Sequence, residues 1–97
     1  MTMHNPPHPG EFINDVYLEP HGVSGRELAA KLDVATSTLS RLLKGTSRVT
    51  PEMALRLSKA IGRSPESWLL LQDNHDLWLA RKHVDLKRVA KLKLAVA

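Results

Sequence analysis

The sequence predicts an all-α domain of five helices, the last of them long. Helix-start signals recur along the chain, apolar residues repeat at helical spacing behind them, and no strand hairpin is evident. The chain has 97 residues, of which 42% are apolar and 25% are charged, a composition typical of a globular protein rather than of a disordered one. We therefore expect one compact domain over residues 1–83, followed by a basic tail over residues 84–97.

The first helix is predicted over residues 9–18. Pro9 suits a first helical position because its φ is already fixed near the helical value, and Pro20 and Gly22 stop the segment. Four apolar residues at helical spacing are expected to face the core, namely Phe12, Ile13, Val16 and Tyr17. The preceding residues are rich in His and Pro and are expected to form a loose terminus.

The second and third helices are predicted to begin at Ser24 and near Thr36. Ser24 and Glu27 have the spacing of a capping box, in which each side chain satisfies a backbone N–H at the start of a helix. This second helix ends near residue 32. The third runs over residues 36–44, and Gly45 is placed to close it in a left-handed conformation.

The fourth and fifth helices share one start signal, a hydroxyl residue followed by proline. Thr50 and Pro51 begin the fourth, which ends before Gly62, and Ser64 and Pro65 begin the fifth, which runs to about residue 82. The apolar stripe of the fourth helix comprises Met53, Ala54, Leu57, Ala60 and Ile61. For the basic and apolar residues after the fifth helix, a short helix, a strand and a frayed tail all stay open.

The fifth helix carries more apolar surface than one small core covers. Its apolar residues occupy positions 68–71 and 77–80 and extend around much of the helix. We therefore expect a homodimer whose interface comprises Leu70, Leu71, Leu77 and Trp78. The alternative, that both tryptophans fill the core of one subunit, stays open and applies mainly to Trp68.

Charge is distributed in four blocks of alternating sign. Residues 1–20 hold three carboxylates and no Lys or Arg, whereas residues 21–63 hold eight Lys or Arg against three carboxylates. Residues 64–80 again hold three carboxylates and no Lys or Arg, and residues 81–97 hold six Lys or Arg against one Asp. A basic block inside a folded region is what a polyphosphate partner requires, although such blocks also occur on solvated faces.

Composition disfavours several classes of function. The chain has no cysteine, which excludes disulfides and thiolate metal sites, and its apolar runs are far shorter than the roughly 20 residues of a membrane span. No secretory signal is evident, so a cytoplasmic protein without a membrane partner is expected. His4 and His8, and likewise His75 and His83, lack the further ligand that would complete a metal site. No phosphate loop, nucleophile motif or paired acid is arranged for catalysis, so we expect neither a cofactor nor an enzyme.

Residues 25–44, GRELAAKLDVATSTLSRLLK, have the pattern of two helices that cross at a tight angle. The small Ala29 allows the close approach, and the apolar contacts that fix the crossing comprise Leu28, Leu32, Val34, Leu39 and Leu42. This segment resembles the helix-turn-helix of the phage-repressor-like (xenobiotic-response-element, Xre) family, whose second helix enters the major groove of DNA. Asp33 replaces the usual glycine of the turn but tolerates a left-handed conformation. Ala35 replaces the usual Ser or Thr cap, so that either the first turn frays or Thr36 caps it.

The side chains that point outward from this motif define a predicted DNA-binding surface. Arg41 is the best candidate base reader, because a guanidinium donates two parallel hydrogen bonds to the O6 and N7 of guanine. The other candidate base-reading residues are Thr36, Ser37, Thr38 and Ser40. Contacts to the DNA backbone are expected from Arg26, Lys44, Thr46, Ser47 and Arg48. The alternative is that these are solvated polar residues on amphipathic helices.

Most of the chain, from about residue 4 to residue 82, is similar to one branch of this family, the HigA-type antitoxins. The resemblance rests on HNPPHPGEFI, on the span from VSGRELAAKL to SPESWLLLQ, and on DLWLARK. It implies a dimeric antitoxin that neutralises a RelE-like mRNA-cleaving toxin and represses its own operon, and a two-fold dimer implies an inverted-repeat operator in double-stranded DNA. The acidic first helix, with Phe12 and Tyr17, is a candidate toxin contact. Two alternatives stay open: a stand-alone phage-type transcriptional regulator without a toxin partner, and an interaction module that binds protein only.

Overall fold

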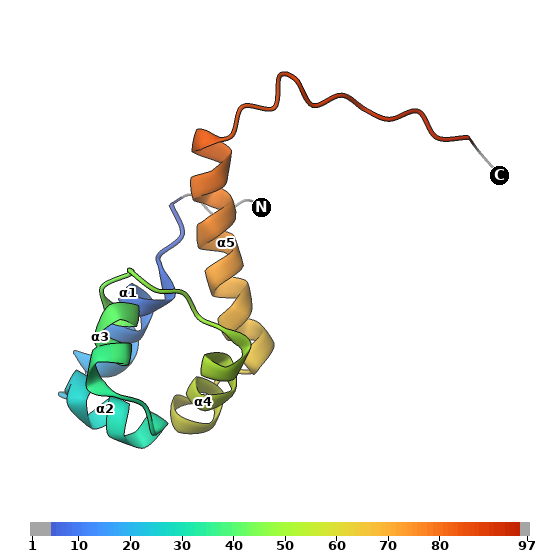
Figure 1. Cartoon of the computed structure of the whole chain (residues 1–97). Coiled ribbons are helices and arrows are strands. Elements are labelled where there is room, and N and C mark those ends of the chain that lie inside the picture. The colour runs from blue at the N-terminus through green and yellow to red at the C-terminus, as the bar shows by residue number, and fades with distance from the viewer. Residues whose placement is uncertain (1–4, 96–97) are drawn as a thin grey trace.

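The computed structural model describes residues 5–95, and every regular element within that range is helical. The elements are, in order, α1 (Pro9–Ile13), the π-helical segment η1 (Asn14–Leu18), α2 (Gly25–Leu32), α3 (Thr36–Leu43), α4 (Pro51–Ile61) and α5 (Pro65–His83). Because η1 continues α1 without a break, the chain forms five helices, and the predicted all-α fold with a long last helix is confirmed (Figure 1).

Three of the predicted helix caps form as expected. The side-chain oxygens of Ser24, Thr50 and Ser64 each accept a hydrogen bond from the backbone N–H three residues further on, at 3.1, 3.2 and 3.0 Å. Helix α3 differs, because its N-cap is Ala35 and no side chain caps it. The first backbone N–H groups of α3 therefore lack a side-chain acceptor within the protein.

The first helix widens into a π-helix in its second half. The N–H of Glu19 donates to the carbonyl oxygen of Asn14 at 2.9 Å, five residues back rather than four. A five-residue step changes the angle between successive side chains, so a pattern based on 3.6 residues per turn does not continue through this segment. The prediction that Val16 faces the core is accordingly wrong, since its side chain is 43% exposed.

The predicted loose terminus is wrong for the described residues 5–8. The side chain of His8 is buried, and its Nδ1 accepts a hydrogen bond from the N–H of Gly10 at 2.9 Å, which makes His8 the N-cap of α1. Its ring meets the ring of His75 edge to face, with the centroids 5.2 Å apart, and His75 Nδ1 lies 3.0 Å from the carbonyl oxygen of Pro6. The segment thus packs on α5. His4, also placed in the loose terminus, lies outside the described residues.

We expect the free energy of unfolding to decrease as the pH falls below about 6.5. Burial, and then the neighbouring His75, lower the pKa of His8 from its ordinary value of 6.5, while Asp76 and Glu11 act in the opposite direction. A lowered pKa means that the folded state binds the proton less tightly than the unfolded state. The stability is therefore complete above the unfolded pKa and is lost as the pH falls through the folded pKa.

Urea unfolding at about pH 5 and about pH 7.5 measures this effect, with His8→Asn as the test variant. Asparagine is a good N-cap but does not titrate, so the stability of His8→Asn should depend less on pH than that of the parent protein. His21→Asn is the matched control, because it makes the same substitution at an exposed position. The same pH dependence in His8→Asn and the parent would contradict the role of His8.

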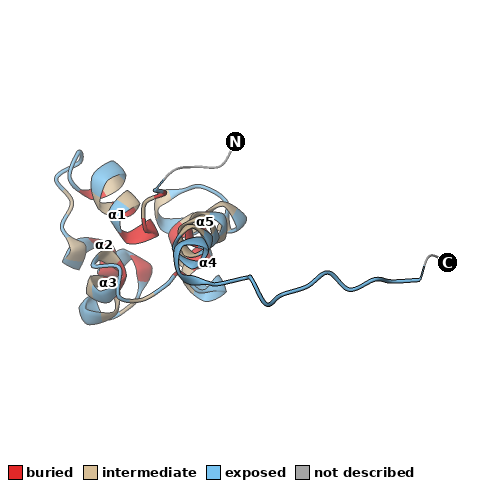
Figure 2. Cartoon of the chain, turned by 90° about the horizontal axis from the view of Figure 1, so that it is seen from above, coloured by how far each residue is buried: buried red, intermediate tan, exposed pale blue. Residues whose placement is uncertain are grey.

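One hydrophobic core joins all five helices. Figure 2 shows the buried positions where the helices face one another. The core residues are Ile13, Leu18, Leu28, Ala29, Leu32, Leu39, Leu42, Val49, Ala54, Leu57 and Trp68. Trp68 is fully buried and its Nε1 donates to the carbonyl oxygen of Gly62 at 2.9 Å, so the alternative that it fills the core of one subunit is confirmed. Ala60, expected on the apolar stripe of α4, is exposed instead.

Residues 84–95 leave the end of α5 and form neither a helix nor a strand (Figure 1). Every residue of this segment is exposed, including five large apolar side chains. A turn near its start is closed by the N–H of Val89, which donates to the carbonyl oxygen of Leu86 at 3.0 Å. Among the helices within residues 5–95, none has both the length and the apolar character that crossing a membrane needs.

Candidate nucleic-acid interface

Helices α2 and α3 are joined by a tight left-handed turn. Asp33 adopts φ 57° and ψ 47°, as predicted for the position where glycine is usual. Ala29 is buried between the helices, and its carbonyl oxygen accepts from the N–H of Val34 at 3.1 Å. Four of the five predicted apolar contacts are fully buried and Val34 is half-buried. The crossing of the two helices is therefore held by the residues that the sequence indicated.

A contact from α4 also holds this turn. Arg56 Nη1 donates to the carbonyl oxygens of Leu32 and Asp33, at 2.8 and 3.2 Å. A cation at the carboxyl end of a helix satisfies free carbonyl groups and interacts favourably with the helix dipole. Arg56 thus fixes the angle at which α3 leaves α2, a role that the sequence analysis did not predict because Arg56 lies 24 residues beyond Leu32.

Helix α3 presents its polar residues outward to different extents. Thr36, Ser37 and Arg41 are exposed, whereas Thr38 and Ser40 are half-buried. Of the five candidate base-reading residues, three therefore have fully accessible side chains and two reach solvent at the flanks of the helix.

Two shallow clefts flank α3. The first, of about 330 Å³, lies on the side of Thr36 and Ser40 and is lined by the cations Arg26 and Lys44 and by Asn14. The second, of about 240 Å³, lies on the opposite side of the helix. Its polar and charged lining residues are Thr38, Arg41, Ser47, Arg48, Thr50 and Glu52. Helix α3 is therefore a ridge between two clefts, each of which is lined by two cationic side chains.

This arrangement brings together predicted residues that are far apart in the sequence, and it adds three polar or charged residues that were not predicted, Asn14, Thr50 and Glu52. Arg26 begins α2 and Lys44 ends α3, yet they line the same cleft. Asn14 and Thr50 also line these clefts. No signal in the sequence places Asn14 beside α3, because the two meet only through the packing of the first helix. Thr50 was recognised only as a helix cap.

The loop after α3, residues 44–50, is folded back onto the end of that helix. The N–H and the hydroxyl of Thr46 both donate to the carbonyl oxygen of Arg41, at 2.9 and 3.0 Å. The hydroxyl hydrogen of Thr46 is thus occupied within the protein, although the residue is exposed. Ser47 is half-buried, whereas the two cations of this loop, Lys44 and Arg48, are both exposed.

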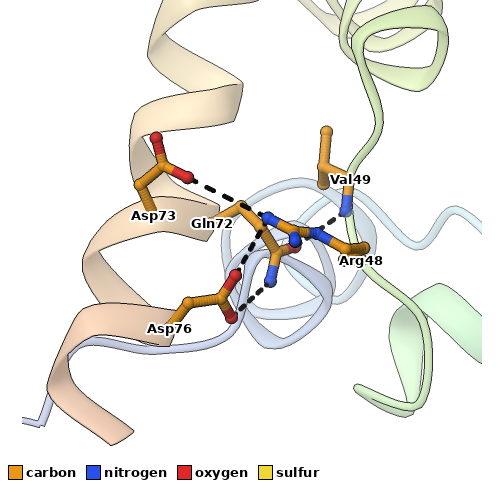
Figure 3. A network of polar contacts seen from close by, with 5 residues as sticks. All are labelled: Arg48, Val49, Gln72, Asp73 and Asp76. Atoms are coloured by element: carbon orange, nitrogen blue, oxygen red, sulfur yellow. Dashed lines mark hydrogen bonds and ion pairs between the residues drawn. The ribbon is translucent and has the colours of Figure 1, made fainter. Parts of the chain in front are cut away.

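Arg48 is held by carboxylates of α5. Its Nη2 lies 3.0 Å from Asp76 Oδ2 and 3.9 Å from Asp73 Oδ1 (Figure 3). The guanidinium side chain remains 60% exposed, so it can still meet a second anion. The sequence analysis did not predict this contact, since these aspartates lie in a separate acidic block about 25 residues further on.

The four predicted dimer residues of α5 do not share one environment. Leu70 and Leu77 are 59% and 49% exposed. Leu71 packs against the core, and Trp78 is half-buried with Lys82 Nζ 3.7 Å from the centre of its ring. The exposed large apolar side chains of α5 are therefore Leu70 and Leu77, which lie seven residues apart on the same side of the helix, together with Leu79.

An exposed polar helix, held across a tight left-handed turn by a second helix, defines the helix-turn-helix class of proteins. The described geometry of α2 and α3 has this form. The chain belongs to the helix-turn-helix family, whose model matches residues 17–68. This match and the similar proteins described next together confirm the resemblance to the Xre type and to HigA antitoxins.

Similar proteins include a regulator and two antitoxins. The HTH-type transcriptional regulator YddM of Escherichia coli strain K12 is 47% identical over 92 residues, which is 95% of this chain and 97% of that protein. The structure of antitoxin GraA is 38% identical and has a TM-score of 0.86, covering 93% of this chain and all of that one. The structure of the Pseudomonas aeruginosa antitoxin HigA with the higBA promoter is 30% identical, with a TM-score of 0.75 over 79% of this chain and 84% of that one.

Proposed function

We propose that this protein is a HigA-type antitoxin that acts in the cytoplasm as a repressor and reads its operator with α3. The observation that carries the proposal is the ridge formed by α3 between two cation-lined clefts. The similarity to an antitoxin solved with its promoter supports it. DNA phosphates flank each groove of the double helix, so cations on both sides of an inserted helix complement them.

The roles of the individual residues follow from their positions. Arg41, exposed in the last turn of α3, reads guanine, and Thr36 and Ser37 contact neighbouring base edges. Thr38 and Ser40 make the more peripheral contacts, because they are half-buried. The start of α3 lacks a side-chain cap, so its free N–H groups bind phosphate. Backbone contacts come from Arg26, Lys44, Ser47 and Arg48. Thr46 orders the loop that carries them instead, because its N–H and hydroxyl both donate to the Arg41 carbonyl oxygen.

The protein binds DNA as a homodimer. Leu70 and Leu77 expose apolar surface on α5, and Leu71 and Trp78 border it. A two-fold dimer places two recognition helices about 34 Å apart, one turn of DNA, so its operator is an inverted repeat. Binding of one half-site makes binding of the second intramolecular, which raises the overall affinity.

The toxin partner is a RelE-like mRNA-cleaving protein, and it contacts the first helix. Glu11, Asp15 and Glu19 are all exposed along the first helix, so its surface is acidic and suits a basic ribonuclease. Of the apolar residues expected to take part, Phe12 and Tyr17 pack against the core instead. The exposed Val16 is the apolar residue available on this surface.

A second candidate function is that of a stand-alone transcriptional regulator with the same DNA-binding mode and no toxin. It is favoured by the 47% identity with YddM, which is named as an uncharacterized HTH-type transcriptional regulator and not as an antitoxin. The two functions can be distinguished by one measurement: whether a protein encoded beside this gene co-purifies with this chain.

Co-purification of the tagged chain with the protein encoded by its genomic neighbour, followed by footprinting of the upstream DNA, tests the proposal. We expect a RelE-like protein to be retained and an inverted repeat to be protected. Protection without a retained partner would favour the stand-alone regulator. A retained partner without protection would identify a module that binds protein only, and would remove DNA reading from the proposal.

A further inference from the structure

A buried amide connects α5 to the loop that follows α3. Gln72 is only 2% exposed, and its Oε1 accepts a hydrogen bond from the N–H of Val49 at 2.7 Å. Val49 is itself buried in the core. A buried backbone N–H without an acceptor costs the full desolvation penalty of that group, so Gln72 determines where the backbone of residues 44–50 can lie.

The nitrogen of the same amide is connected to Arg48 through the carboxylate of Asp76. Gln72 Nε2 donates to Asp76 Oδ1 at 3.0 Å, and the second oxygen of that carboxylate lies 3.0 Å from Arg48 Nη2 (Figure 3). The chain of contacts therefore runs from a buried backbone N–H, through one amide and one carboxylate, to an exposed guanidinium.

The type of residue at position 72 matches both of its contacts. The side-chain amide of glutamine both accepts and donates a hydrogen bond. A glutamate there would accept from Val49, but it would have no proton to donate to Asp76 and would repel it. A leucine of similar size would make neither contact. The side chain thus has a specific polar role where α5 faces the loop after α3.

We infer that Gln72 is a positioning residue for DNA binding: it fixes the loop and orients the Asp76 carboxylate, which holds the Arg48 guanidinium toward phosphate. The inference rests on the proposed function. A guanidinium has five N–H donors, so one contact to Asp76 leaves others for a phosphate oxygen. An arginine that is already ordered loses less conformational freedom on binding than a mobile one.

A competing account assigns the aspartates an inhibitory role, in which they neutralise Arg48 and keep it from phosphate. The two accounts predict opposite effects on operator binding for a substitution of Gln72 that leaves the net charge unaltered. If Gln72 positions Arg48, then Gln72→Leu weakens operator binding about threefold to tenfold, the range for ordering one long side chain. If the aspartates only neutralise Arg48, releasing it strengthens binding.

The test is a double-mutant cycle on the full chain and its footprinted operator, with Kd measured by fluorescence anisotropy for Gln72→Leu, Arg48→Ala and the double variant. We expect the double variant to bind less weakly than the product of the two single effects predicts, because Gln72 acts mainly through Arg48. Arg48→Ala should reduce the slope of log Kd against log salt by about one, as for the loss of one phosphate contact, whereas Gln72→Leu keeps the guanidinium and should change the slope little. Two independent effects that multiply would overturn the inference, as would tighter binding by Gln72→Leu.

A second pair of variants covers the case in which Gln72→Leu does not fold. Asp73→Asn and Asp76→Asn each remove one negative charge near Arg48, but only Asp76 receives the Gln72 hydrogen bond and holds the guanidinium at 3.0 Å. Asp76→Asn should therefore bind the operator about threefold to tenfold more weakly than Asp73→Asn. Equal affinities would overturn the inference.

Failure of the parent chain to protect any operator overturns the proposed function as well, whereas a protected operator with a failed cycle overturns the inference alone.

Discussion

Replacing Gly10 by alanine is expected to lower the melting temperature by more than about 10 °C, because 1 kcal/mol corresponds to roughly 4–8 °C in a domain of this size. Gly10 is buried where α1 crosses α3, and an added Cβ would overlap the carbonyl oxygen of Leu42 and lie 2.8 Å from Leu43 Cα. Both are backbone atoms of a packed helix, and they cannot move away by bond rotation as the end of a side chain can. Overpacking of a core costs about 1–3 kcal/mol and sometimes more, and we expect a value at the upper end.

Thermal unfolding followed by circular dichroism measures this effect, and Gly25→Ala is the matched control. Gly25 is also at the start of a helix, but a Cβ there would meet only Leu43 Cδ1 at 3.4 Å, an ordinary contact with a flexible side chain. Alanine favours the helix, so the melting temperature of Gly25→Ala should stay the same or rise slightly. If both variants melted alike, the close approach of α1 and α3 would be wrong.

Replacing Arg41 by alanine is expected to weaken operator binding by about 1–3 kcal/mol, or roughly fivefold to 150-fold in Kd. The Arg41 side chain is exposed, and the bonds that its carbonyl oxygen accepts from Thr46 do not depend on the side chain. The fold should therefore be unaffected. Because guanine is read through two parallel hydrogen bonds, the loss should fall mainly on the specific sequence.

Lys44→Ala is the comparison that separates base reading from charge. Lys44 lines the cleft on the other side of α3, and a lysine there acts on phosphate as a point charge. Its removal should weaken binding to operator and to scrambled DNA about equally and reduce the salt dependence. Anisotropy titrations on both DNAs distinguish the two variants. Operator binding that is unchanged by Arg41→Ala would remove Arg41 from the base readers.

The parts of the fold that could be predicted from the sequence are those determined within a few residues. Ser24, Thr50 and Ser64 cap their helices because the oxygen and the N–H that it accepts from lie three residues apart. Asp33 takes the left-handed turn because its short polar side chain tolerates that conformation better than most residues do. The apolar contacts between α2 and α3 likewise follow from helical spacing. Local geometry was therefore sufficient for the helix starts and for the crossing of α2 and α3.

The features that were missed depend on contacts between distant segments or on a change of helical period. His8 is ordered by α5, which lies more than 60 residues further along the chain. Gln72 and Arg56 reach the DNA-binding region across 23 and 24 residues. In the first helix, the π-helical hydrogen bonds turn Val16 outward, and no residue type in the sequence predicts that change. Such contacts become visible only when the helices are placed in space.

Trp68 has a consequence for how the protein is made. Its ring contacts Phe12 and Tyr17 of the first helix, with ring centroids 6.0 and 5.9 Å apart, and it occupies the centre of the core. While the ribosome has synthesised only the first half of the chain, Phe12 and Tyr17 lack this aromatic partner. Helix α3 is thus synthesised early, whereas the core that it shares with Trp68 is completed late, after most of the polypeptide has emerged.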